Sequence, residues 1–417
     1  MLRWLYPRSL VCALLLVLPA CAGSSGSGFP LPPPEPDFPG LILRLSEQGG
    51  FFPSDNLVSN ETSYQHVLGK MDALGVKGGV YVGVGPDQNF TYIAAIRPEI
   101  AFLIDIRRDN LLHHLLFKAV FERARNRLEF LSILTGRPVP DNALEQTGTG
   151  IESIVAQIDA AAPDSRYFRQ TATAIVQTIL SWRVPLTDAD LRVVQRIHEA
   201  FRRHGLDLRY AQVPRYPTWR QLILETDLEG RRRNYLANDT TFRYVQAMQR
   251  RHRIVPVTGD VAGEHALAAI GNEVRSRGLT VTTLYISNVE QYLMRGATFP
   301  VYAGTLLGLP FDSTSVIIRS YFGRGAPLPQ TIRGHYSTQL LELFTDFANQ
   351  IRSGGYDSYI DLVTRHALPL RTGRDTGAIS VEAGWLPSMH GSWPAVRGNR
   401  RIRCTDSGGI SCSPALN

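Results

Sequence analysis

The fold class is decided by residues 79–110, which read GVYVGVGPDQNFTYIAAIRPEIAFLIDIRRDN. An apolar strand over 80–84 is followed by a glycine turn, and the next residues, 88–97, predict a helix that Pro98 ends. The almost wholly apolar segment 100–106 is typical of a parallel strand buried on both faces. A strand, glycine turn, helix and second strand form a unit that commonly binds a nucleotide-like ligand.

The alternation of strand and helix surrounds a long helical stretch. Helices are predicted over 61–74 and 110–127, strands over 253–257, 279–286 and 315–322, and further helices over 263–277, 336–352 and 356–366. Between them, helical periodicity dominates, over 151–162, 165–182, 187–204 and 240–252, with Thr187 and Asp190 as a capping box. The sequence therefore predicts an α/β fold with a doubly wound, mostly parallel sheet, formed by 41–127 and 250–365 and carrying 128–249 as a helical insertion.

The first 20 residues have the plan of a signal peptide, because arginines precede an apolar run too short to span a bilayer comfortably. Residues 18–21, LPAC, resemble a bacterial lipobox, which implies cleavage before Cys21 and lipidation of that residue. Since Ala22 rather than Asp follows, we expect a lipoprotein of the bacterial cell envelope, held in the outer membrane and facing the periplasm. The alternatives are an ordinary signal peptide, or a cytoplasmic enzyme whose start lies further downstream.

Both ends of the chain are expected to lack a packed core. Residues 21–40 are rich in Gly, Ser and Pro and predict a linker, which argues against a downstream start. Residues 366–417 are rich in Gly, Pro, Ser and Arg and predict a loosely ordered tail. In an oxidising compartment, Cys404 and Cys412 are expected to form a disulfide.

The bulk composition excludes little. A hydrophobic content of 44% is ordinary for a globular fold. The net charge of +7 comes with arginines scattered among acids, and we interpret it as a solvated surface; no nucleic-acid partner is expected. Adjacent histidines such as His113 and His114 rarely face one ion, so no metal site is predicted.

The glycine turn suggests a particular kind of ligand. Gly83 and Gly85 would allow the backbone to approach a ligand closely, and Asp105 follows Gly85 by 20 residues at the end of the next strand. An acid at that place can accept hydrogen bonds from ribose hydroxyls. Gln88 stands where a dinucleotide fingerprint has its third glycine, which disfavours NAD and FAD and favours an adenosine without phosphates.

These motifs resemble those of the class I S-adenosylmethionine-dependent methyltransferase superfamily, over about 55–125 and 250–325. The quoted segments are VGVGPD (82–87), FLIDIRRDN (102–110), PVTGDV (256–261), LYISNVEQYL (284–293) and the upstream DNLVSNE (55–61). The resemblance implies a Rossmann-like fold that binds S-adenosylmethionine through Gly83, Gly85, Asp87, Asp105, Asp260, Ser287 and Asn60. It implies substrate contacts for Asn288, Glu290 and Glu61. Two departures stand out: Tyr81 replaces the usual leading acid of the first loop, and the fourth motif lacks the N-P-P-Y form.

Each polar candidate also has a structural interpretation. Asp105 could cap the following helix, although Asp109 is the better cap, and Asp260 could cap a helix at 263. Asn288 with Glu290, and Asn60 with Glu61, could be capping pairs. Two functions therefore stay open: methyl transfer to an unknown substrate, or a non-catalytic module that binds a small molecule or protein at the envelope. The periplasm is not a known reservoir of S-adenosylmethionine, which favours the second.

Overall fold

The computed structural model describes Met1 and residues 31–144, 148–323 and 327–371. Cys21, Cys404 and Cys412 lie outside the described residues, as do the signal segment after Met1 and the tail beyond 371. Within the described ranges, no helix has the length and apolar character needed to cross a membrane.

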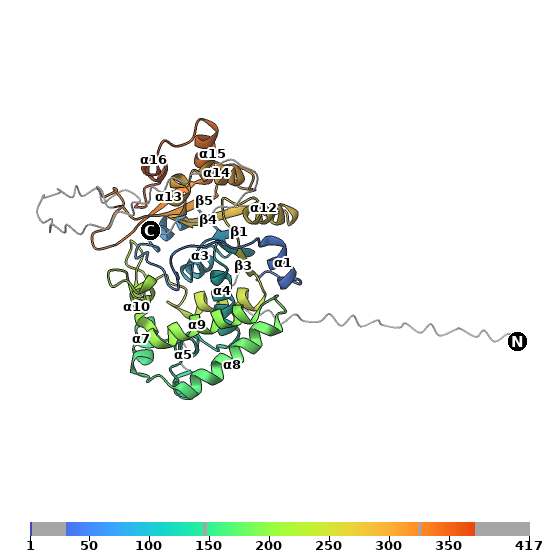
Figure 1. Ribbon diagram of the computed structural model, residues 1–417, viewed down its shortest axis with the longest axis vertical. Helices are drawn as coiled ribbons and strands as arrows, with labels where there is room; N and C mark the ends of the chain where they lie inside the picture. The colour runs from blue at the N-terminus through green and yellow to red at the C-terminus, as the bar shows by residue number, and fades with distance from the viewer. Residues whose placement is uncertain (2–30, 145–147, 324–326, 372–417) are drawn as a thin grey trace, which may run out of the picture. The chain divides into compact units, whose positions relative to one another are not determined.

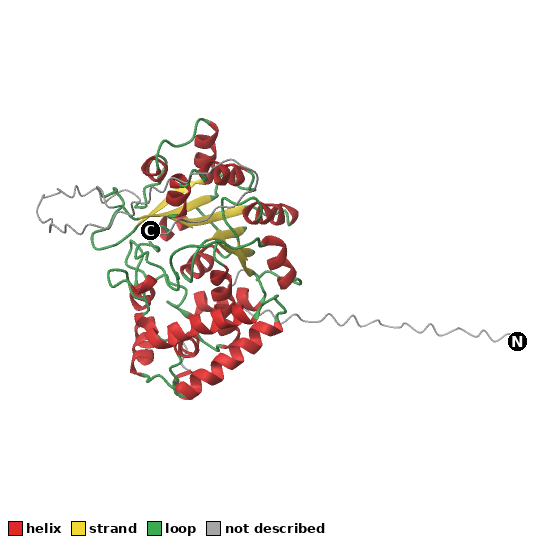
Figure 2. Ribbon diagram, in the orientation of Figure 1, coloured by secondary structure: helices red, strands yellow, loops and turns green. Residues whose placement is uncertain are grey.

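A six-stranded sheet with the order β3-β2-β1-β4-β5-β6 organises the protein (Figures 1 and 2). Its strands are β1 (Val80–Gly83), β2 (Ile100–Asp105), β3 (Ile254–Thr258), β4 (Val281–Ser287), β5 (Val316–Tyr321) and β6 (Thr338–Leu343). The pairings from β3 through β5 are parallel, and β6 runs antiparallel to β5 at the edge. An antiparallel edge strand on a parallel sheet is common in doubly wound folds. The prediction of an α/β fold with a mostly parallel sheet is confirmed.

Helices bury the strands in the centre of the sheet. Every residue of β1 and β3 is buried, as expected for strands covered on both faces. The helices α3 (Gln88–Ile96), α4 (Arg108–Arg123) and α12 (Ala266–Ser276) connect or flank these strands. Because α4 is buried along most of its length, it joins the sheet to the helices that follow.

The segment between β2 and β3 is helical after α4, as predicted. It contains α5 (Arg127–Thr135), α6 (Asp141–Leu144), α7 (Ile151–Ala160), α8 (Ser165–Ser181), α9 (Asp188–His204), α10 (Trp219–Leu224), α11 (Asp239–Arg250) and the 3₁₀ turns η1 (Gly205–Asp207) and η2 (Tyr210–Gln212). The predicted capping box of Thr187 and Asp190 begins α9. Since α5, α8, α9 and α11 contact α4, and sheet and helices fall in one compact unit, the structure does not define a separate inserted domain (Figure 1).

The packed body begins before the predicted boundary at residue 41. Helix α1 (Phe38–Leu45) falls partly in the predicted linker, and its residue Phe38 is buried against Trp182. Glu35 is also buried and pairs with Arg277 at 2.9 Å. The described end of the predicted linker is therefore anchored to the body, because a buried ion pair and a helix both fall within it.

Outside this helical stretch, further elements differ from the sequence predictions. The predicted helix over 336–352 is β6 followed by α15 (Phe344–Arg352), because the leucines of β6 pair with the edge of β5. The predicted helix over 61–74 is helical only in α2 (Leu68–Ala73), after a run of turns. Helix α14 (Phe299–Leu307) was not predicted; it lies between α13 (Val289–Arg295) and β5, and α16 (Tyr359–Thr364) follows α15.

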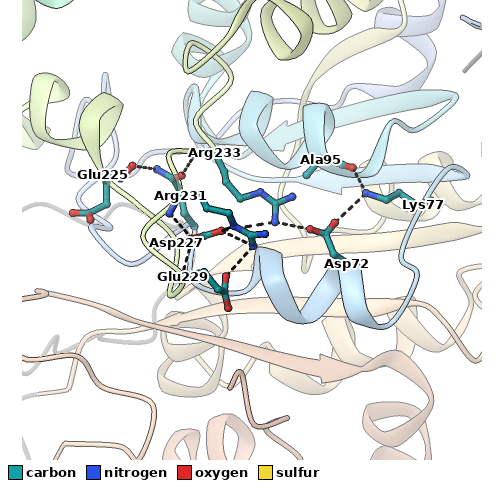
Figure 3. Close-up of polar contacts among 9 residues, drawn as sticks. Asp72, Lys77, Ala95, Glu225, Asp227, Glu229, Arg231 and Arg233 are labelled. Carbon is teal, nitrogen blue, oxygen red and sulfur yellow. Dashed lines mark hydrogen bonds and ion pairs between the residues drawn. The ribbon is translucent and has the colours of Figure 1, made fainter. Parts of the chain in front are cut away.

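A cluster of ion pairs fixes the loop between α10 and α11 (Figure 3). Arg233 contacts Asp72 of α2 at 2.6 Å, and Arg231 contacts Asp227 at 2.8 Å. Lys77 also donates to Asp72, at 3.1 Å. Such partly exposed pairs contribute little stability individually, but together they hold this loop against α2.

Candidate ligand cavity

A cavity of about 1020 Å³ lies where the parallel strands end. Its wall includes Gly85 after β1, Asp105 at the end of β2, Asp260 after β3, and Ser287 with Asn288 at the end of β4. In doubly wound sheets, ligands bind outside the carboxyl ends of the strands, where the strand order reverses. Here that point lies between β1 and β4, which are neighbours in the sheet. The structure thus brings the predicted motifs together around one cavity.

The two glycines of the turn have different roles. Gly85 lines the cavity with a φ of +80°, a left-handed conformation that side chains rarely adopt. Gly83 lies in β1, where an added Cβ would come within 2.1 Å of Asn89 Oδ1. The Asn89 amide donates to the carbonyls of Val84 and Gly85, at 2.9 and 3.2 Å. Gly83 therefore supports the turn by leaving room for Asn89, and it does not line the cavity.

Asp105 lines the cavity but already has a cationic partner. Its Oδ1 accepts from the backbone N–H and the Nε of Arg107, at 2.8 and 3.3 Å, and its Oδ2 accepts from Nη2 at 3.2 Å. Burial raises the pKa of Asp105, and the charge of Arg107 partly offsets this. Nη1 of Arg107 donates to the carbonyls of Ser54 and Asp55. A carboxylate offers about four acceptor positions, so about one remains for a ligand hydroxyl.

Glu61 provides a buried carboxyl on the cavity wall. Glu61 is only 1% exposed. Its Oε1 accepts hydrogen bonds from the hydroxyls of Tyr285, at 2.7 Å, and Ser287. Oε2 has no hydrogen-bond partner among the described residues. Burial raises the pKa of Glu61, while the hydroxyl of Ser287 and other nearby polar groups lower it in part. Oε2 is itself buried, so the carboxyl is connected to the cavity through the Ser287 hydroxyl, which lines the wall.

The remaining cavity candidates lie in loops and do not cap helices with their side chains. Asp260 Oδ1 accepts from the backbone of Ala262 at 2.9 Å, within the loop that precedes α12. Asn288 occupies the position before α13 without a side-chain capping bond. Asn60 also lines the cavity. Asp105 and Asp109 do not cap α4, whose preceding residue is Arg107. The capping interpretations of these residues are therefore not supported.

Besides Gly83, two predicted site residues lie outside the cavity wall. Asp87 is buried, where it accepts from Trp219 Nε1 at 2.8 Å and from the Tyr235 hydroxyl at 3.2 Å; burial raises its pKa to about 6. Glu290 is fully buried and forms an ion pair with Arg319. Both carboxyls are engaged in the core, so these positions do not support the predicted cofactor contact of Asp87 or the predicted substrate contact of Glu290.

The aromatic roof of the cavity was not predicted from the sequence. The ring centroids of Tyr210 and Tyr216 are 5.3 Å apart, and those of Tyr216 and Tyr336 are 5.0 Å apart. Phe52 meets Tyr292 at 5.4 Å. These rings come from four distant segments, so no local pattern could reveal them. A signal from composition lies at 209–217, RYAQVPRYP, which is rich in tyrosine, proline and arginine and interrupts the helical stretch.

Strained backbone accompanies the cavity. Asn56 and Ser287, which line it, have positive φ values of 48° and 55°. Ala211 and Gln212, which follow Tyr210, have values of 47° and 50°. Residues other than glycine in this conformation cost about 1–3 kcal/mol each and cluster at functional sites. Their concentration here supports a binding role for the cavity.

The histidine pair is part of the packing around the glycine turn. His114 Nε2 is 2.9 Å from the carbonyl oxygen of Gly85, and His113 packs against Phe117 with ring centroids 4.4 Å apart. In the described part of the chain, no group of three or more His, Cys, Asp or Glu residues is arranged to hold a metal ion.

The fold and the cavity define a class of α/β protein with a ligand site at the carboxyl ends of a mostly parallel sheet. The chain belongs to a family described as a domain of unknown function (DUF7790), whose profile matches residues 57–368. No curated protein matches it. Among solved structures, the chain is similar to the rRNA methyltransferase aviRa from Streptomyces viridochromogenes, with 12% identity and a TM-score of 0.28, over 73% of this chain and 97% of that chain. A likeness this remote carries no functional argument.

Proposed function

We propose that the cavity binds S-adenosylmethionine and that the protein transfers its methyl group to an acceptor molecule. The observation that supports this most is the convergence of Gly85, Asp105, Asp260 and Ser287 on one cavity at the switch point of the sheet. Gln88 also lines this cavity, and its amide donates to the Tyr285 hydroxyl at 3.0 Å. Gln88 stands where a dinucleotide fingerprint has its third glycine, so the turn is not open to a pyrophosphate. This favours an adenosine-type ligand.

The residues present fit such a ligand. Gly85 allows its backbone to approach, and the free acceptor position of Asp105 suits one ribose hydroxyl. Asp260 stands where the resemblance places the acid beside the adenine. Glu61, Ser287 and Asn288 lie together on another part of the wall, and this part is the proposed place of the acceptor.

The bound cofactor would supply an electrophilic methyl group on a sulfonium. The chain's own contribution is to position the acceptor and to receive its proton. In this proposal Asn288 orients the acceptor. The nucleophilic O–H or N–H passes its proton to the Ser287 hydroxyl, which gives its own proton to Glu61 Oε1. Tyr285 and Ser287 hold Oε1 in place, and the raised pKa makes Glu61 a stronger proton acceptor once it is ionised.

A non-catalytic binding module is the second candidate, and the state of Asp105 favours it. Arg107 fills most of the acceptor positions of this carboxylate and links it to the carbonyls of Ser54 and Asp55. A ribose that needs both oxygens of Asp105 would have to displace Arg107. A different ligand that leaves this arrangement intact would use the cavity without methyl transfer.

Calorimetry of the purified protein with S-adenosylmethionine and S-adenosylhomocysteine tests the proposal. We expect both to bind, and D105A to bind at least about tenfold more weakly, because a hydrogen bond to a charged group contributes about 1.5–3 kcal/mol. D109A is the matched control, since Asp109 pairs with Arg196 on the surface. Folded protein that binds neither compound would eliminate the cofactor proposal, and the binding module would remain.

We also propose that the protein is lipid-anchored through Cys21 in the outer membrane. The lipobox-like LPAC segment at 18–21 supports this proposal. Metabolic labelling with a palmitate analogue is expected to mark the wild type and not C21S. Label that persists in C21S would remove the anchor from the proposal.

A further inference from the structure

A second hollow adjoins the cavity and extends it. This side groove has a volume of about 500 Å³ and is formed by α13, α14 and the start of α16. It shares Gln291, Arg295 and Tyr359 with the wall of the main cavity. The two hollows therefore lie next to each other along these three residues.

The side groove is largely apolar. Met294, Ala297, Phe299, Pro300 and Tyr356 line it. Apolar side chains of the adjoining main cavity are also exposed. Ile360 is 44% exposed and Tyr292 45%. Exposed apolar groups that gather around a hollow mark a place where a ligand or partner removes them from water. The groove is therefore suited to an apolar chain.

A cation lies at the junction of the two hollows. Arg295 is exposed and has no carboxylate or hydrogen-bond partner among the described residues. The one acid that lines the groove, Asp357, has a side chain that is 97% exposed and lies 3.9 Å from Arg365. Arg295 also occupies the last turn of α13, where a cation is favourable for any helix. Arg352 has the same position in α15 but lines neither hollow. A variant of Arg352 therefore shows the effect of losing a cation at a helix end without any effect on a ligand.

We propose that the cavity and the side groove together bind an amphipathic anion. Its apolar chain lies along Met294, Phe299 and Pro300, its carboxylate or phosphate pairs with Arg295, and its polar end reaches the cavity. That this molecule is the methyl acceptor rests on the proposed function, whereas its binding does not.

Binding is tested by the fluorescence of cis-parinaric acid, an unsaturated fatty acid, without any cofactor. Dodecyl phosphate and dodecanol serve as competitors, and they distinguish a phosphate from a carboxylate and either from a neutral chain. We expect R295Q to weaken binding of the anions about tenfold, which corresponds to about 1.4 kcal/mol, and to leave dodecanol unchanged. The control R352Q is expected to bind like the wild type.

A second variant tests the groove wall. P300D places a carboxylate there, and it lies in the first turn of α14, where an acid is favourable, so the fold should be retained. We expect it to weaken both anions and dodecanol. Equal binding by R295Q and R352Q, or dodecanol binding as tightly as the anions, would overturn the inference. S-adenosylmethionine binding without parinaric acid binding would reject this inference alone, and the converse would reject only the proposed function.

Discussion

Replacing Glu61 with glutamine should stabilise the protein at neutral and alkaline pH. Burial raises the pKa of this carboxyl above its ordinary value of 4.5. At a pH between 4.5 and the raised pKa, the folded state holds a proton that the unfolded state has released. The free energy of unfolding therefore falls as pH rises through this window. Each unit by which the pKa is raised costs about 1.4 kcal/mol once the pH exceeds the folded value. The amide of E61Q does not ionise, so E61Q removes this loss.

A comparison of E61Q with E61A separates the effect of the charge from the effect of losing a hydrogen-bond acceptor. Glutamine keeps an acceptor oxygen for Tyr285 and Ser287, and its amide group takes the buried place of Oε2, beside the polar side chains of Ser320 and Gln339. Alanine would leave the buried hydroxyl of Tyr285 without its acceptor, at a cost of about 1–3 kcal/mol. E61A should therefore be less stable than E61Q by at least that amount.

Urea unfolding followed by tryptophan fluorescence, from pH 4 to pH 8, measures both effects. The difference in unfolding free energy between E61Q and the wild type should be small near pH 4 and grow with pH until it levels off. A difference that stays constant across this range would refute the argument. So would an E61Q variant that is less stable than the wild type at pH 8.

Two further buried charges give predictions about stability. Burial lowers the pKa of Lys118 from 10.5 to about 7, so the unfolded state binds more protons between these values and stability should rise with pH by up to about 1.4 kcal/mol per unit. Urea unfolding from pH 6 to 10 should show this slope in the wild type and not in K118M. Arg319 lies between Glu290 and Glu342. R319M should lose about 3–5 kcal/mol in the same assay, because two buried carboxyls then lack a cation. Stability is expected to recover when Glu290 and Glu342 are also replaced by glutamine. A loss below about 1 kcal/mol in R319M would contradict the argument.

The centre of the sheet could be predicted because its signals are local. Apolar runs bounded by Gly and Pro marked β1 and β2, and Gly85 at φ +80° confirms the turn after β1. The edge of the sheet could not be predicted in this way. The leucines of β6 satisfy a helical spacing as well as a strand, and only pairing with β5 decides between them.

The floor of the cavity was also accessible to sequence reasoning, because each residue follows a predictable strand. Asp105, Asp260 and Ser287 are examples. Their partners were not accessible. Arg107 is held beside Asp105 by the carbonyls of residues 54 and 55. Glu290 lies in the core because it pairs with Arg319 of another strand. Spacing along the chain gives no information about such contacts.

The aromatic roof makes the cavity depend on the last described part of the chain. Its contacts join Phe52 to Tyr292 and Tyr216 to Tyr336, segments that are far apart in the chain. The loop-closure entropy of such contacts must be overcome before they contribute any stability. The sheet has the same requirement, because β1 pairs with β4 across a similar stretch of chain and β6 follows Tyr336. During synthesis, the roof and the sheet would be completed together, and a fragment that ends before Tyr336 would lack that ring and the edge strand β6.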